Sequence, residues 1–223
     1  MLNKLYLYLY SIYSIYFKYK VFLKKKSYAQ SREDVFIKSQ FPKNFKGFFV
    51  DVGCNHPIRI NNTYLLYLQG WRGINIDMDY KSIFLFNFLR DQDLNFNYAV
   101  SKEKKKINFF FNKKSDLNGS IIKTKKFRYN KKIQSYPLNY ILSKTKYKNK
   151  KIDFLSIDAE DSDFEVLKSL NLNVYCPRFI CIEIRGSSMN KKKLRKSTIY
   201  SYLIKKKYKL VFSQGENQIF KYK

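Results

Sequence analysis

Acidic side chains at the ends of short apolar runs are the groups in this sequence best suited to chemistry. The run Phe48-Phe49-Val50 ends at Asp51, shortly before Gly53, and the run Ile74-Asn75-Ile76 ends at Asp77. Short apolar runs of this kind are typical of parallel strands that are covered on both faces. In α/β proteins, nucleotides bind at the carboxyl ends of such strands. The two runs therefore indicate a nucleoside site.

The spacing of the two runs supports this interpretation. Asp77 lies 24 residues after Gly53, close to the interval of about 20 residues at which an acid meets the ribose hydroxyls in doubly wound folds. Residues 62–69 between them are predicted to form a helix that stops at Gly70. Asp77 is the first candidate for the ribose, and Asp79 is the second. Gly53 alone would suit an ordinary turn equally well, although it also leaves room for a ligand.

A third group of carboxylates follows the apolar run 152–157. Asp158 stands at the end of this predicted strand and is the best placed of the group, whereas Glu160 and Asp161 would also suit the first turn of the next helix. Glu183 lies inside a later apolar strand, where a charge is costly unless it is paired or functional. Asp158, Glu160 and Glu183 are therefore candidates for catalysis.

The remaining segments alternate between strands and helices. Glu33 and Asp34 indicate a helix N-terminus, and a lysine-rich turn predicts a hairpin between strands 94–100 and 107–111. Residues 112–132 are predicted to be a long, mobile, basic excursion of the kind that often covers a substrate site. Further helices are predicted at 80–89, from 137, at 164–170 and at 198–206, and further strands at 179–184, 208–213 and 218–222.

Length and charge limit the class of protein. A chain of 223 residues suits one domain with an appendage. The net charge of +28 would ordinarily suggest nucleic acid. Here the lysines are spread along the chain, so nucleic acid is not the expected partner, although anionic membranes, glycans or phosphorylated substrates would be attracted. Three cysteines without a Cys-x-x-Cys pair, and one histidine, argue against a disulfide scaffold or a zinc site, and fit a cytoplasmic protein.

The first 26 residues stand apart from the rest, 27–223. Residues 5–23 are apolar and aromatic but too rich in tyrosine for a good membrane span, and no small-residue cleavage site follows them. Tyrosine and lysine together are typical of segments that lie at a membrane interface. We expect peripheral membrane contact through residues 1–26, an extra helix packed on the domain, or a partly disordered leader whose composition has drifted.

Several of these segments occur in the order found in FkbM-type methyltransferases, which are class I S-adenosylmethionine-dependent enzymes. The chain resembles that family from about Tyr28 to its C-terminus. The matching segments are Ser27-Tyr28-Ala29-Gln30 with Glu33-Asp34, Phe49-Val50-Asp51-Val52-Gly53 with His56-Pro57, Asn62-Thr63-Tyr64, Gly70-Trp71-Arg72-Gly73-Ile74-Asn75-Ile76-Asp77, Ala99-Val100-Ser101, and Ile152-Asp153-Phe154-Leu155-Ser156-Ile157-Asp158.

The resemblance implies a doubly wound α/β fold of the Rossmann-like class I methyltransferase type. Its sheet would have seven mostly parallel strands with helices on both faces and an antiparallel C-terminal strand pair. The implied activity is O-methylation, often of a sugar or of a hydroxyl in a secondary metabolite, with S-adenosylmethionine as cofactor. The candidate cofactor-binding residues are Asp51, Gly53, Cys54 and Asn55 near the methionine, Asp77 with Met78 near the ribose, and Ala99 with Val100 near the adenine.

The resemblance also places Asp158 and Glu160 at the reaction centre. Methyl transfer to an alcohol needs an aligned oxygen and a group that takes its proton. The candidates for that base are Asp158, Glu160, His56 and Glu183. His56 titrates near neutrality, but a ring that bonds the turn would explain it as well. The family commonly has Glu-Gly where Glu160-Asp161 stands, and the extra carboxylate would cap a helix or alter substrate fit.

Other interpretations remain open from the sequence. Asp158 with Glu160 could hold a divalent cation through oxygen ligands, although no metal is assigned. A nicotinamide-dependent oxidoreductase would share the scaffold, but the second and third glycines of its phosphate loop are missing. A basic RNA-binding protein or RNA methyltransferase lacks the usual aromatic signature here. A non-catalytic relative that scaffolds a membrane assembly is the last alternative.

Overall fold

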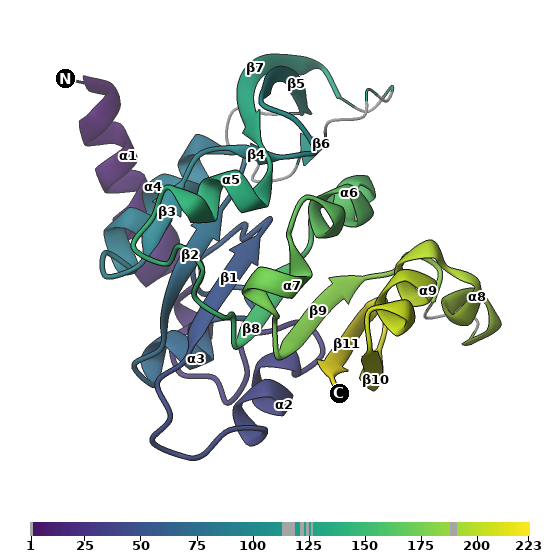
Figure 1. Ribbon diagram of the computed structural model, residues 1–223. Helices are drawn as coiled ribbons and strands as arrows, with labels where there is room; N and C mark the ends of the chain where they lie inside the picture. The colour runs from purple at the N-terminus through teal and green to yellow at the C-terminus, as the bar shows by residue number, and fades with distance from the viewer. Residues whose placement is uncertain (1, 113–118, 121–122, 124, 126, 188–190) are drawn as a thin grey trace.

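A seven-stranded sheet forms the centre of the molecule in the computed structural model, which describes residues 2–112, 119–120, 123, 125, 127–187 and 191–223 (Figure 1). Its strands stand in the order β10-β11-β9-β8-β1-β2-β3. The adjacent strands β9, β8, β1, β2 and β3 pair with one another in parallel, whereas β11 is antiparallel to both β9 and β10. The bounds are β1 Phe48–Val52, β2 Arg72–Ile76, β3 Leu94–Phe96, β8 Phe154–Ile157, β9 Phe179–Glu183, β10 Tyr208–Gln214 and β11 Asn217–Tyr222.

This arrangement confirms the predicted mostly parallel sheet with an antiparallel C-terminal pair. Every residue of β1 is buried because both faces of the sheet are covered. Val50 and Val52 face one hydrophobic cluster together with side chains of α5, α6 and α9, whereas Phe49 faces another cluster with side chains of α2 and α3. Alternate residues of one strand thus belong to opposite layers.

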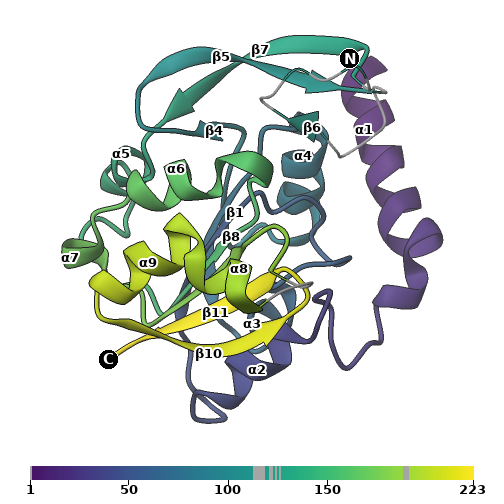
Figure 2. The ribbon, with the colours of Figure 1, turned by 90° about the vertical axis from the view of Figure 1, so that its right-hand side faces the viewer.

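Helices cover both faces of the sheet, as predicted (Figures 1 and 2). On the face of Val50 lie α5, α6, α7, α8 and α9, and on the face of Phe49 lie α2 and α3, with α4 alongside β2 and β3. The bounds are α2 Glu33–Ser39, α3 Tyr64–Leu68, α4 Tyr80–Leu89, α5 Leu138–Ser143, α6 Asp163–Lys168, α7 Leu172–Tyr175, α8 Lys191–Lys196 and α9 Thr198–Lys205, with a short 3₁₀ turn η3 at Glu160–Ser162.

A second sheet of four strands stands over the carboxyl end of β1 (Figure 1). Its order is β4-β7-β5-β6, with bounds β4 Ala99–Val100, β5 Lys105–Phe111, β6 Gly119–Ser120 and β7 Tyr129–Tyr136. The predicted hairpin between 94–100 and 107–111 is therefore wrong. The first of these runs breaks at Asn97, whose side chain bonds the Asp77 carbonyl, and its two halves join different sheets.

The predicted excursion at 112–132 is also partly wrong. Residues 129–132 belong to β7, which pairs with β5 from Tyr129 to Ser135. The strand was missed because its lysines fill exposed or half-exposed positions and only Ile133 and Ser135 are buried. Residues 113–118, 121–122, 124 and 126 of the excursion lie outside the described residues. The sequence also missed α7, of four residues, and α8, whose buried side chain is Leu194.

The N-terminal leader packs on the domain as an extra helix beside α4 (Figure 1). It consists of α1 Leu2–Ile12, a π-helical segment η1 Tyr13–Lys18 and a 3₁₀ turn η2 Lys20–Phe22. Ile15 is fully buried in a cluster with Ile58 and Leu85, and the ring of Tyr8 meets Phe88 edge-on at 5.3 Å. Within the described part of the chain, no helix combines the length and apolar character that crossing a membrane requires.

Candidate active site

A pocket opens at the carboxyl ends of β1, β2 and β8, beneath the four-stranded sheet. Its empty space, counted together with the open mouth, is about 680 Å³. Parallel strands bring distant segments of the chain to this edge. The lining residues are Val52, Gly53, Asn55, Ile76, Asp77, Met78, Tyr98, Ala99, Val100, Phe109, Gly119, Asp158, Ala159, Glu160 and Ser162.

Gly53 brings two walls of the pocket together. Its φ of +78° lies in the left-handed region, where residues with a side chain are strained. A Cβ atom at this position would stand 1.7 Å from the carbonyl oxygen of Asp158. The position that a side chain at residue 53 would need is therefore occupied by the backbone after β8. Gly53 lets the loop after β1 lie directly against the end of β8, next to Asp158.

Asp77 is half-buried in the pocket, where its carboxylate orders the surrounding loops. One oxygen accepts a hydrogen bond from the backbone N–H of Asn55 at 2.8 Å and the other accepts from that of Asp79 at 2.7 Å. Burial raises the pKa of Asp77 to about 7, against the lowering effect of these two bonds. Each carboxylate oxygen can accept a further hydrogen bond, so Asp77 can bind a ligand and hold the loop at once.

Asn55 supplies a second acceptor in the pocket. Its side-chain oxygen is buried and has no hydrogen-bond partner among the described residues, although a buried acceptor of this kind is normally satisfied. The residue has a φ of +52°, a conformation that asparagine tolerates better than most residues. Asn55 therefore offers a fixed, unpaired oxygen to a ligand that carries a donor.

Asp158 follows β8 directly and lines the pocket. Burial is the largest cause that raises its pKa, to about 6, and the nearby charge of Glu160 adds to this effect. A hydrogen bond with Glu183 acts in the opposite direction. Glu183 itself is half-buried behind the pocket lining, and burial followed by the charge of Asp158 raises its pKa to about 8. Glu183 therefore binds a proton more readily than an isolated glutamate does.

Glu160 lies at the exposed mouth of the pocket. It adopts a φ of +57° and forms an ion pair with Arg185. The predicted capping of α6 by Glu160 is not seen, because Ser162 occupies the cap position. Instead, the Asp163 carboxylate accepts a hydrogen bond from the N–H of Ala159 at 2.8 Å and closes the turn. The Asp161 side chain lies outside the described part of the structure.

Five of the candidate residues do not line the pocket, namely Glu183, Asp79, Asp51, Cys54 and His56. Asp51 is buried and accepts hydrogen bonds from the hydroxyl of Thr63 at 2.9 Å and the amide of Asn61 at 3.4 Å. The Cys54 thiol is buried beside α4, and burial raises its pKa well above the usual value. His56 lies under the N-terminal leader.

The surroundings of His56 keep its ring neutral. Its Nδ1 accepts hydrogen bonds from the N–H groups of Ile58 at 3.2 Å and Arg59 at 3.1 Å, and its Nε2 lies 3.3 Å from the Ser14 hydroxyl. Burial is the main cause that lowers the pKa of His56 to about 3, and the charge of Arg59 adds to it. These contacts anchor the leader to the loop after β1.

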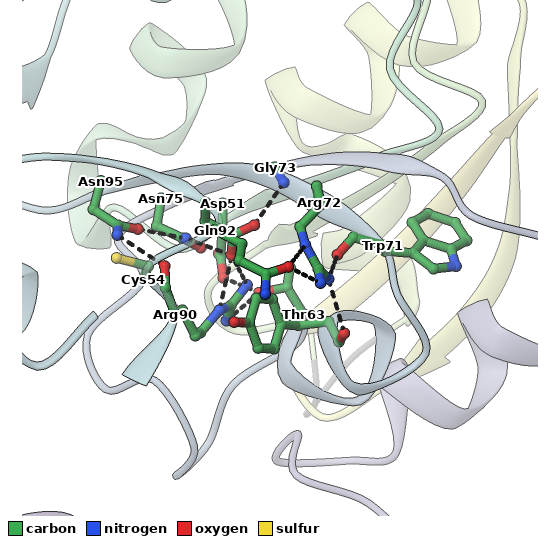
Figure 3. Close-up of polar contacts among 12 residues, drawn as sticks. Asp51, Cys54, Thr63, Trp71, Arg72, Gly73, Asn75, Arg90, Gln92 and Asn95 are labelled. Atoms are coloured by element: carbon green, nitrogen blue, oxygen red, sulfur yellow. Dashed lines mark hydrogen bonds and ion pairs between the residues drawn. The ribbon is translucent and has the colours of Figure 1, made fainter. Parts of the chain in front are cut away.

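A buried network centred on Arg90 supports the floor of the site (Figure 3). The guanidinium is fully buried, forms an ion pair with Asp93 at 2.9 Å and donates to Thr63 at 3.0 Å and Asn61 at 3.2 Å. Thr63 in turn donates to Asp51. The rings of Phe49, Tyr67 and Phe86 have their centroids 5.0–5.1 Å from the guanidinium carbon, which favours a cation.

Asp93 extends this network to β2. Its carboxylate accepts hydrogen bonds from the backbone N–H of Gly73 at 2.8 Å and from the side chain of Asn75 at 3.2 Å. Through Asp93 and Arg90, the network therefore connects β2, which directly precedes Asp77, with β1, which contains Asp51.

The sequence did not predict Arg90 or Asp93. It also did not predict the lining residues Tyr98, Phe109, Gly119 and Ser162. The only signal for Gly119 was the predicted excursion at 112–132 over a substrate site, whereas Phe109 was predicted only as part of the strand 107–111.

The strand order, with its antiparallel final pair and its pocket at the carboxyl ends of β1, β2 and β8, defines a class I methyltransferase-like fold. A family model described as the methyltransferase FkbM domain matches residues 51–210. The chain thus belongs to the FkbM family of S-adenosylmethionine-dependent methyltransferases, and its cofactor is S-adenosylmethionine. This assignment favours methyl transfer over the nicotinamide-dependent and RNA-binding alternatives.

Comparison with individual proteins adds little detail. Among solved structures, the chain is similar to a TehB-like SAM-dependent methyltransferase from Corynebacterium glutamicum, with 13% sequence identity and a TM-score of 0.43. The alignment covers 86% of this chain and 87% of the other. No curated protein sequence matches the chain significantly.

Proposed function

We propose that the protein transfers the methyl group of S-adenosylmethionine to a hydroxyl group of a sugar, a glycan or a secondary metabolite. The observation that carries this proposal is the position and the pKa of Asp158. An alcohol must lose its proton as it is methylated, and a base with a pKa close to the working pH serves this step best. Asp158 lines the pocket, and with a pKa of about 6 it is mostly ionised at neutral pH.

The pocket residues fit the cofactor. Asp77 would accept hydrogen bonds from the ribose hydroxyls, and the unpaired oxygen of Asn55 would accept one from the methionine ammonium group. Met78, Ala99 and Val100 would flank the adenine with apolar surface. When bound, the cofactor supplies an electrophilic sulfonium methyl group, which needs only an aligned nucleophile.

Asp158 and Glu183 would divide the proton chemistry. Asp158 takes the proton of the acceptor hydroxyl, because it is the ionised member that reaches the pocket. Glu183 keeps its proton and orients Asp158 by the hydrogen bond between them. Glu160, at the mouth beside Arg185, would meet the acceptor rather than the reacting oxygen. His56, buried and neutral beneath the leader, is a weaker candidate for the base.

Methyl transfer to defined acceptors tests the proposal. Isotopically labelled S-adenosylmethionine is incubated with matched acceptors that carry a hydroxyl, an amine or a thiol on the same sugar or aromatic scaffold. We expect label in the hydroxyl compounds, and loss of label when the hydroxyl is removed or already methylated. Transfer to the amine or thiol members alone would contradict O-methylation while leaving the methyltransferase assignment intact.

Asp77→Ala is expected to weaken cofactor binding by about 10–100-fold, since hydrogen bonds to a charged group contribute about 1.5–3 kcal/mol. Calorimetric titration of the full chain with S-adenosylhomocysteine measures this change. Asp91→Ala is the matched control, because Asp91 is an exposed acid outside the pocket lining. If Asp77→Ala bound the ligand as tightly as the control does, the ribose assignment would be wrong.

A further inference from the structure

The N-terminal leader has two apolar faces on opposite sides. The inner face contains Leu7 and Ile15, which are buried with Ser11 and Ser14 against the domain. The outer face contains five large side chains that are 45–69% exposed, namely Leu5, Leu9, Tyr13, Tyr16 and Phe17. Side chains spaced by three or four residues share one face of a helix, so these five form a continuous stripe along α1 and η1.

This outer stripe lacks the polar character of a surface helix. A helix that packs on a domain by one face usually presents charged or polar residues on the other, and contiguous exposed apolar patches mark interaction sites. Along the chain, six exposed lysines border the stripe, with Lys4 before it and Lys18, Lys20, Lys24, Lys25 and Lys26 after it. The first acidic residue of the chain is Glu33. The leader is therefore an apolar and aromatic surface with positive charge only.

We propose that this outer stripe, together with the bordering lysines, binds an anionic membrane surface, with the leader lying in the plane of the interface. Tyrosine rings and lysine ammonium groups suit the headgroup level, where they can bury an apolar body and keep a polar end in water. A second copy of the chain is the less suitable occupant, because each copy carries a net charge of +28.

The contacts of the inner face make the leader a rigid part of the domain. The Tyr19 ring packs edge-on against His56 at 4.9 Å, and the Arg59 guanidinium lies 4.9 Å from the same ring. His56 and Arg59 belong to the loop that leaves β1 next to the pocket. In both views, the N-terminal end of α1 lies at the end of the molecule that carries the four-stranded sheet (Figures 1 and 2). Membrane contact through the leader would thus hold the pocket at a fixed orientation to the bilayer.

Vesicle sedimentation of the full chain tests the proposal without any acceptor. The vesicles contain phosphatidylcholine alone or with phosphatidylglycerol, at about 0.15 M and about 0.5 M salt, where screening lengths are near 8 Å and under 5 Å. The test variant is Leu9→Ser with Phe17→Ser, and the matched control is Leu68→Ser with Ile204→Ser. The control residues are 54% and 43% exposed on α3 and α9, and both variants preserve the net charge.

We expect the wild type and the control variant to bind the anionic vesicles and to retain part of this binding at the higher salt. The test variant should partition at least about tenfold more weakly, because it loses the apolar surface that would enter the interface. Equal binding of both variants would show that diffuse charge alone attracts the protein, and would overturn the proposal. Absence of wild-type binding, or a wild-type dimer that the test variant abolishes in sedimentation equilibrium, would overturn it too.

Discussion

Asp158→Asn is expected to lower kcat for methyl transfer by about 10²–10⁴-fold, the range that a general base contributes. Asparagine has nearly the same shape but cannot take a proton from the acceptor. Affinity for S-adenosylhomocysteine should stay close to that of the wild type, because Asp77 and Asn55 are unchanged. Single-turnover rates with saturating cofactor, together with calorimetric titration, separate the two effects. The matched control is Glu160→Gln, which alters the exposed carboxylate paired with Arg185 and should reduce kcat much less.

The same base gives the reaction a characteristic pH dependence. The pKa of Asp158 is raised to about 6, so the ionised form needed for catalysis is present above this pH and is lost as the pH falls through it. At saturating S-adenosylmethionine, the profile of kcat/KM for the acceptor reports the groups of the cofactor-bound enzyme, and in the wild type it should decline below about pH 6. Asp158→Asn should remove this acidic limb. An unchanged limb in the variant, or full wild-type turnover, would assign the base elsewhere.

Arg90→Leu is expected to destabilise the protein by about 3–5 kcal/mol, the usual effect of removing one partner from a buried ion pair. The substitution leaves the Asp93 carboxylate uncompensated in the interior and withdraws a donor from the Thr63 hydroxyl that bonds Asp51. Each kcal/mol shifts Tm by about 2–4 °C in a chain of this length. The melting temperature should therefore fall by about 6–20 °C.

Arg72→Leu is the matched control for this experiment. Arg72 lies in the same region (Figure 3), but it is only half-buried and its partners are the neutral Gln92 and backbone carbonyls. Its loss should destabilise the protein by about 1 kcal/mol, as expected for ordinary hydrogen bonds. Equal melting temperatures for the two variants would mean that the Arg90 network does not depend on its buried charges.

The sequence predicted those parts of the site that depend on single strands. Asp77 and Asp158 each follow an apolar run, and the carboxyl ends of parallel strands meet at one edge of a sheet. The seven-stranded sheet, both layers of helices and the roles of Met78, Ala99 and Val100 were expected from the resemblance to the FkbM family, and the structure has this sheet and places these three residues in the pocket lining. The observed bounds of some elements differ from the predicted bounds by a few residues. Helix α3, for example, is shorter than the predicted helix 62–69.

The sequence could not predict contacts that depend on the side of a strand or on distant pairing. Asp51 is close to Gly53 along the chain, but it faces the layer of Phe49 and bonds Thr63 instead of lining the pocket. His56 follows the same turn and packs under the leader, which a local pattern does not reveal. In the four-stranded sheet, β5 pairs with β7 across a lysine-rich segment. No pattern within either segment of the sequence indicates the register of this pairing or the position of the sheet over the pocket.

The inner face of the leader has a practical consequence for protein production. A truncated chain that began at residue 27 would lose the cover over Ile58 and Leu85, which now share a cluster with Ile15. Newly exposed apolar surface of this kind promotes aggregation. The truncated form should therefore be recovered mainly in insoluble material. To raise solubility, substitutions on the outer stripe of an intact leader are a better choice than removal of the leader.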